Sequence, residues 1–170
     1  DPGQPFYRYT KDPRNNSIRV VEMLDAFLED EPAIDEYTQY YTQLGQGLKV
    51  HPLVSYGSHS VNHYVLSSLS EDQQWCEIDE NYRFLETLPG VYRTRVFSVP
   101  FGGNWDYNDA TSRLVADAGH SAMLLSRGAV QRNDACHDGL LPMVDRVMPR
   151  DAEVPAFLAD LQTRLSRKGR

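Results

Sequence analysis

The sequence predicts an α/β protein with a mostly parallel sheet, and three observations support this fold class. Strand-like and helix-like segments alternate through the second half of the chain, an order typical of parallel strands joined by helices. The chain has 170 residues, 41% of them hydrophobic, so it can bury a hydrophobic core without needing disulfide bonds or a structural metal. No internal repeat or low-complexity tract interrupts it. In such folds, functional groups gather in loops beyond the carboxyl ends of the strands.

For the N-terminal part of the chain, the sequence predicts an irregular start followed by two helices. Residues 1–15 are rich in proline and glycine and are expected to be irregular. A helix is predicted from Ser17 until the acidic cluster at 29–31 and Pro32, because five residues share one apolar face: Val20, Val21, Leu24, Phe27 and Leu28. A second helix is predicted over 34–44, and its tyrosines are interpreted as a packing face rather than a sugar-stacking stripe.

The remaining elements follow in order along the chain. A buried strand is predicted at 53–56, followed by a polar segment at 57–63. Ser70 and Gln73 form a capping-box pattern at the start of a helix that should end at Pro89 and Gly90. After it we expect strands at 96–99, 122–125 and 140–147, a helix from about 108 to Gly119, and a closing amphipathic helix over 154–165.

Charge and composition exclude several kinds of partner. The net charge of −7 argues against nucleic acid and against an anionic membrane as general partners. No run approaches the roughly 18 consecutive apolar residues of a membrane span, and the N-terminus carries no signal-peptide pattern. These observations do not specify a cytoplasmic or an extracytoplasmic location. Cys76 and Cys136 could pair, stay free or bind a metal, and because they form no C-x-x-C motif we favour two buried or idle thiols.

The strongest chemical signal is a group of histidines near the middle of the chain. His51, His59 and His63 lie within thirteen residues, and the last two are four residues apart. In a helical or turn-like backbone this spacing places both imidazoles on one face, where each can donate a ring nitrogen to one divalent cation such as zinc. Solvated or structurally bonded histidines remain the alternative. The peptidase pattern H-E-x-x-H does not apply, because Ser60 occupies the position of its general base.

The surroundings of this pair resemble a known enzyme family. Residues 57–63 (G-S-H-S-V-N-H) resemble the G-[AS]-H-[ST]-x-x-H segment of the polysaccharide deacetylases, also called NodB-homology or carbohydrate esterase family 4 enzymes, and 51–54 (H-P-L-V) also look like members. Residues 97–102 (F-S-V-P-F-G) stand where the family has R-P-P-Y-G or F-x-Y-P-x-G. Residues 107–109 (Y-N-D) and a helix ending in A-G-H match the order of its next element.

The resemblance covers roughly residues 48–127 and implies a specific architecture. That architecture is a partial or irregular (β/α) barrel of the NodB/polysaccharide deacetylase type. Residues 1–170 would form a single domain, the C-terminal part of a NodB-like deacetylase domain. Within it, 1–47 would be a helical insertion region and 48–170 the barrel strands and helices.

The resemblance also implies roles at the matching positions. His59 and His63 would be two of the three protein ligands of a divalent metal, usually zinc in this family. The backbone N–H of Phe101 would stabilise the oxyanion that forms when water attacks an N-acetyl carbonyl. The family's arginine, which orients the catalytic carboxylate, is replaced by Ser98. His137 is a candidate for the general acid, with an ordinary loop histidine as the alternative.

Two neighbouring residues are assigned to substrate binding. Pro100 belongs to the bend itself. Trp105 follows the bend closely and either stacks on a sugar ring or packs against the barrel rim. Asp145 and Arg146, near the end of the last predicted strand, form an exposed or paired ion couple, and we assign them no role.

The chain departs from the family in one respect. The family places T-F-D-D near the start of the domain, and its two aspartates serve as general base and third metal ligand, whereas this chain contains no Asp-Asp pair. We expect either that an upstream segment supplies the aspartates or that the chain is a degenerate member. The start at Asp1 rather than at Met favours the first explanation.

The expected function is that of a hydrolase in carbohydrate metabolism. The enzyme would be a metal-dependent deacetylase that cleaves the carbon–nitrogen (amide) bond of N-acetylated amino sugars in a polysaccharide or oligosaccharide. One alternative is a degenerate, non-catalytic carbohydrate-binding module of the same fold. Another is a small α/β protein whose histidines are accidental.

Overall fold

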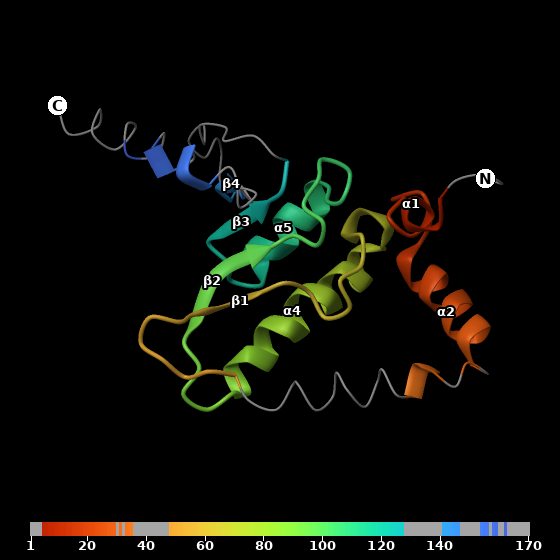
Figure 1. Cartoon of the computed structure of the whole chain (residues 1–170), viewed down its shortest axis with the longest axis horizontal. Coiled ribbons are helices and arrows are strands. Elements are labelled where there is room, and N and C mark those ends of the chain that lie inside the picture. The colour runs from red at the N-terminus through yellow and green to blue at the C-terminus, as the bar shows by residue number, and fades with distance from the viewer. Residues whose placement is uncertain are drawn as a thin grey trace.

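The computed structural model describes residues 5–29, 31, 33–35, 48–127, 141–146, 154–156, 158–159 and 162. Figure 1 shows the order of the elements along the chain. They are α1 (Phe6–Thr10), α2 (Ser17–Leu28), β1 (Tyr56–Ser58), the 3-10 turn η1 (Leu66–Ser68), α4 (Glu71–Thr87), β2 (Arg93–Ser98), α5 (Asp109–Asp117), β3 (Ala122–Leu125) and β4 (Met143–Asp145). No described helix is both long enough and apolar enough to span a membrane.

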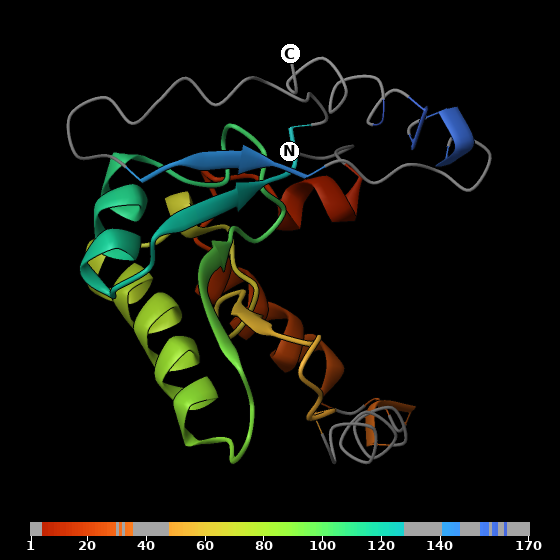
Figure 2. The ribbon, with the colours of Figure 1, turned by 90° about the vertical axis from the view of Figure 1, so that its left-hand side faces the viewer.

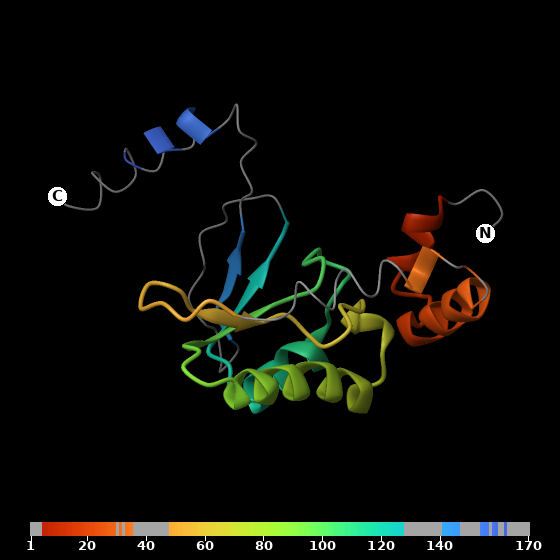
Figure 3. The same ribbon diagram turned by 60° about the horizontal axis from the view of Figure 1, so that its bottom comes forward.

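The strands that the structure describes form one four-stranded parallel sheet, in the order β1-β2-β3-β4. Figure 3 shows α4 and α5 lying together on one side of this sheet. Because all three strand pairs are parallel, the carboxyl ends of the four strands meet at the same edge of the sheet. The predicted α/β class with a parallel sheet is therefore confirmed, and the described strands form an open sheet.

The core lies between this sheet and the two helices. Strand side chains alternate between faces, and in β3 the buried residues are Met123 and Leu125. They pack with Ile78 of α4, Val115 of α5 and four more buried apolar residues: Leu66, Leu69, Phe97 and Val99. Each fully buried side chain of this size contributes about 1.5–3 kcal/mol relative to an exposed one. This packing of the sheet against α4 and α5 fixes the position of the edge from which the loops emerge.

The N-terminal helices are attached to the loop region after β1. Asn16 caps α2 by accepting a hydrogen bond from Arg19 N, and its Nδ2 donates to the Ser68 carbonyl at 3.1 Å. Ser17 Oγ accepts from Val65 N at 3.2 Å. In Figure 1, α1 and α2 lie next to the segment that joins β1 to α4, and in Figure 2, seen from the left of Figure 1, α2 lies behind the strands. Residues 5–28 are therefore anchored beside the site described below.

Several predicted elements are found at their expected positions. Helix α2 begins and ends where the apolar pattern does, and β3 has the predicted bounds. In α4 both hydrogen bonds of the Ser70–Gln73 capping box are formed. Helix α5 is followed by Gly119, whose φ of 95° suits a glycine stop. Strand β2 begins three residues earlier than predicted, at Arg93.

Two predictions are wrong. Residues 6–10 form α1 within the segment expected to be irregular, because the Pro5 carbonyl accepts from Arg8 N and Tyr9 N. The strand predicted at 53–56 begins only at Tyr56, because the chain turns beforehand: Val54 N donates to the His51 carbonyl at 2.9 Å. Leu53 is consequently 89% exposed.

Two other predictions fall largely outside the described residues. Of the predicted helix at 34–44, only 34–35 are described, and they are helical. Of the closing helix, 154–156, 158–159 and 162 are helical. Cys136 lies outside the described residues, and Cys76 is a free thiol.

Candidate functional site

His59 and His63 come together in the loop that follows β1. Their ring centroids are 4.7 Å apart at an interplanar angle of 83°. The loop is turn-like rather than helical, because Ser60 and His63 have φ values of 66° and 60°. Ser60 Oγ accepts from His63 N at 3.0 Å, which closes this turn. The spacing that suggested a shared cation therefore corresponds to two adjacent imidazoles.

Hydrogen bonding and burial prepare both rings to act as ligands. His59 Nδ1 lies 2.7 Å from the Ser98 carbonyl of β2. Since a carbonyl only accepts, Nδ1 carries the proton and Nε2 keeps its lone pair, the arrangement typical of metal-binding histidines. Burial lowers the pKa of His63, and the neighbouring His59 lowers it further. The neutral imidazole is the form that binds metal.

Two side chains of α4 hold this loop. Glu77 Oε2 accepts from Val61 N at 3.1 Å and from Asn62 N at 2.8 Å, and Oε1 accepts from Asn62 Nδ2 at 2.6 Å. Asn81 Oδ1 accepts from Ser58 Oγ at 2.7 Å and from His59 N at 3.1 Å. The sequence analysis missed both residues. Their signal was present, because polar residues at i and i+4 interrupt the buried face of an amphipathic helix.

The bend after β2 brings Phe101 against the pair. The Phe101 ring meets His63 edge to face, with centroids 4.6 Å apart, and Phe101 has a φ of 60°. Gly102 fixes the bend, because Gly102 N donates to the Pro100 carbonyl and the Gly102 carbonyl accepts from Ser126 N at 2.8 Å. Within the described part of the chain, the Phe101 N–H meets no acceptor. The bend therefore places the Phe101 ring beside His63.

Arg146 reaches the same region from the end of β4. Its Nη1 donates to Ser98 Oγ at 2.7 Å, and two further donations go to the backbone carbonyls of Val99 and Leu125. Among the described residues it pairs with no carboxylate, and its positive charge contributes to the low pKa of His63. An arginine from another strand thus contacts the position at which the family's own arginine is missing.

The neighbouring Asp145 behaves differently from Arg146. It forms a two-point ion pair with Arg127, with N–O distances of 3.0 and 2.9 Å. Hydrogen bonding to Arg127 lowers the pKa of Asp145. Asp145 and Arg146 follow one another at a strand end, where successive side chains point to opposite faces. The paired-ion interpretation thus applies to Asp145, with Arg127 as its partner, and Arg146 contacts the site.

The other predicted site residues are more dispersed. Pro100 is buried within the bend. Trp105 is 78% exposed, and its carbonyl accepts from Ser67 Oγ. His137 lies outside the described residues. His51 lies in the turn before β1, where its Nδ1 accepts from Leu53 N.

The donors present fit two positions of a zinc site. Two imidazoles with adjacent rings match the nitrogen ligands that zinc prefers. No cluster of three or more His, Cys, Asp or Glu is found among the residues that the structure describes. A third protein ligand would therefore have to come from elsewhere.

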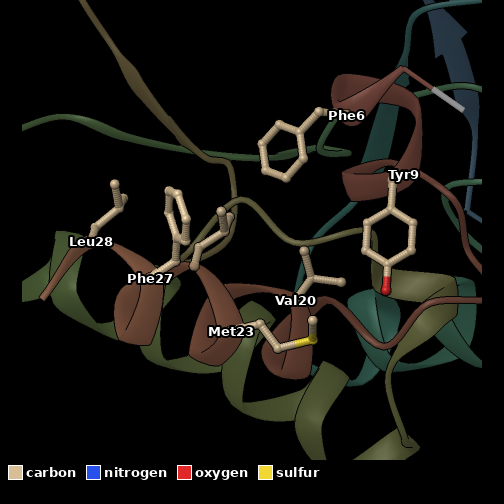
Figure 4. A pocket seen from close by; sticks show the side chains of 7 residues that line it. Phe6, Tyr9, Val20, Met23, Phe27 and Leu28 are labelled. Carbon is tan, nitrogen blue, oxygen red and sulfur yellow. The ribbon is translucent and has the colours of Figure 1, made fainter. Parts of the chain in front are cut away.

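Two hollows lie beside α2. A small one of about 140 Å³ reaches His63 and Phe101. A larger apolar cleft of about 570 Å³ lies between α1 and α2 and is shown in Figure 4. Its lining consists of Phe6, Tyr9, Val20, Met23, Leu24, Phe27 and Leu28. Val20 and Leu24 line both hollows.

Comparison with known proteins supports the resemblance. The family model described as polysaccharide deacetylase matches residues 33–123, a range that includes both histidines and the bend. Among solved structures, the chain is similar to the deacetylase PplD of Streptococcus pyogenes, determined in complex with acetate, at 24% identity and a TM-score of 0.43. That similarity covers 52% of this chain and 36% of that one, so it spans about a third of that structure. No curated protein matches the sequence.

Proposed function

We propose, because the chain belongs to the polysaccharide deacetylase family, that it provides two metal ligands and an oxyanion donor for removing acetyl groups from N-acetylated amino sugars in a polysaccharide or oligosaccharide. One observation carries this proposal. His63 lies 4.7 Å from His59 and 4.6 Å from Phe101, measured between ring centroids. The two imidazoles and the Phe101 ring therefore lie side by side, and the Phe101 N–H belongs to the same bend.

The chain's own residues would act as follows. His59, fixed by its bond to the Ser98 carbonyl, and His63, kept neutral by burial, would hold a divalent metal, which we take to be zinc. A metal bound there would polarise the amide carbonyl and lower the pKa of a bound water towards about 7. The Phe101 N–H would donate to the oxyanion that develops on the former carbonyl oxygen.

Two groups of the reaction remain to be supplied. We propose that an aspartate pair from a preceding segment provides the general base and the third ligand. Arg146 supports this idea, because its guanidinium has no described carboxylate partner and lies beside Ser98. In the same proposal, residues 1–47 form a helical insertion and residues 48–170 belong to the barrel. We also propose that His137 is the general acid.

A second candidate function is a non-catalytic carbohydrate-binding module. The exposure of Trp105 favours it, because a tryptophan that is 78% exposed beside the bend offers a ring face to a sugar. The absence of a third ligand among the described residues is consistent with it as well.

The test compares this chain with a version that begins earlier in its natural sequence. We expect the longer version to bind about one zinc per molecule and to release acetate from chito-oligosaccharides, and His59→Ala or His63→Ala to abolish both. His51→Ala is the matched control, because His51 lies outside the pair. A longer version that releases no acetate but still binds the oligosaccharide would overturn the enzymatic proposal and support the binding module.

A further inference from the structure

The histidine loop needs external support to keep its shape. Ser60 and His63 both have positive φ, a conformation that costs a non-glycine residue about 1 kcal/mol or more. Within the turn, the hydrogen bond from His63 N to Ser60 Oγ offsets part of this cost. The main-chain N–H groups of His59, Val61 and Asn62 donate to side chains of α4, so this helix is a source of support.

Glu77 gives the loop its main support at a high desolvation cost. The residue is only 5% exposed, and no salt bridge joins it to a cation among the described residues. An unpaired buried carboxylate is strongly unfavourable unless hydrogen bonds compensate it. Here three N–H groups do so, and all three belong to Val61 and Asn62, between the two histidines.

Asn81 holds the other part of the loop from the next turn of the same helix. Residues four apart on a helix share a face, so Asn81 and Glu77 both point to the loop. Asn81 Oδ1 binds Ser58 Oγ and His59 N, where β1 ends. Helix α4 therefore contacts the loop at its start and at its middle.

We propose that Glu77 and Asn81 are positioning residues that set the spacing of the two imidazoles, and that α4 acts as the template of the metal site. The role in metal binding rests on the proposed function, whereas the role in ring spacing does not. Both residues act through the loop, because they accept from three of its main-chain N–H groups and from the side chains of Ser58 and Asn62.

The experiment measures ring spacing and metal affinity separately in the full chain. Ring spacing is followed by the nuclear Overhauser effect between the His59 and His63 ring protons in metal-free protein, and affinity by the visible absorption of added Co²⁺. For Glu77→Ala we expect the ring contact to vanish and the Co²⁺ Kd to rise at least tenfold. Asn81→Ala should act in the same direction, and Asn81→Asp should restore the contact, because its oxygen accepts the same two bonds.

Two control variants separate positioning from general stability. Glu80→Ala removes an exposed carboxylate from the same helix and should change nothing. Gln74→Ala removes a buried polar side chain that bonds to Thr111 and to the Leu69 carbonyl, away from the loop. It should lower stability and leave the ring contact and the Kd within twofold.

The milder variant Glu77→Gln keeps the proposal testable if Glu77→Ala does not fold. One amide oxygen can still accept from Val61 N and Asn62 N, so we expect a weakened ring contact and an intermediate Kd. A normal ring contact in Glu77→Gln and Glu77→Ala, or an equal loss in Gln74→Ala, would overturn the proposal. A wild type that shows the ring contact but binds no Co²⁺ would instead count against the proposed function.

Discussion

The buried imidazole of His120 should make the protein lose stability in mild acid. His120 is 3% exposed, and neither ring nitrogen has a hydrogen-bond partner among the described residues. Its ring lies 4.0 Å from that of Tyr82 and 5.4 Å from that of Phe97. Burial lowers the pKa of His120 from 6.5 to about 4, the charge of Arg93 adds to this, and an interaction with the Arg95 backbone opposes it in part.

The size of the effect follows from proton linkage. As the pH falls through 6.5, the unfolded chain binds a proton at His120, whereas the folded protein does so only near pH 4. The free energy of unfolding therefore falls across this window and levels off below it. The expected loss is about 1.4 kcal/mol at pH 5.5 and about 2.6 kcal/mol at pH 4.5.

Urea unfolding of the wild type and of His120→Leu isolates this contribution. Leucine has a similar volume and does not titrate, while the carboxylates that protonate in the same range are common to both proteins. Measured at pH 7.5, 5.5 and 4.5, the stability of the wild type relative to the variant should fall by the amounts above. A difference that stays constant within about 0.5 kcal/mol would show that His120 is not kept neutral by burial.

Three further outcomes can be measured. Gly102→Ala should lower the free energy of unfolding in urea by more than about 2 kcal/mol, because φ is 78° and the new Cβ would lie 2.6 Å from Ser126 N. Arg127→Ala should raise the pKa of Asp145 and lower stability by about 3 kcal/mol at pH 7, a difference that shrinks below about pH 4 as Asp145 becomes protonated in both proteins. Because Trp105 is exposed, we expect chito-oligosaccharides to shift the fluorescence of the wild type, and Trp105→Ala should abolish this shift and leave stability unchanged.

Elements with strong local signals were predictable from the sequence. Helix α4 carries a complete capping box, and α2 has an apolar face of five residues, so local chemistry specified both. The apolar residues at 53–54 resembled a strand start, but the turn at His51 removed them from the sheet. Helix α1 has only five residues, too few for its period to be detected.

The site was predictable only where its residues are neighbours in sequence. His59 and His63 are four residues apart within a recognisable motif. Arg146 and Ser98 are 48 residues apart in the sequence. They meet because β2 and β4 both pair with β3, and the Arg146 side chain reaches across the end of β3 to Ser98. Glu77 and Asn62 likewise meet across the packing of α4 on β1. Such contacts depend on strand order, which no local pattern contains.

Helix α4 binds the histidine loop largely through main-chain N–H groups, so the conformation of the loop depends little on some of its side chains. At position 61 the helix binds only a main-chain N–H, and the Val61 side chain is 47% exposed. Many amino acids should therefore be tolerated there without moving either imidazole. A library randomised at this single position could vary the surface that an incoming polymer meets while its scaffold stays the same.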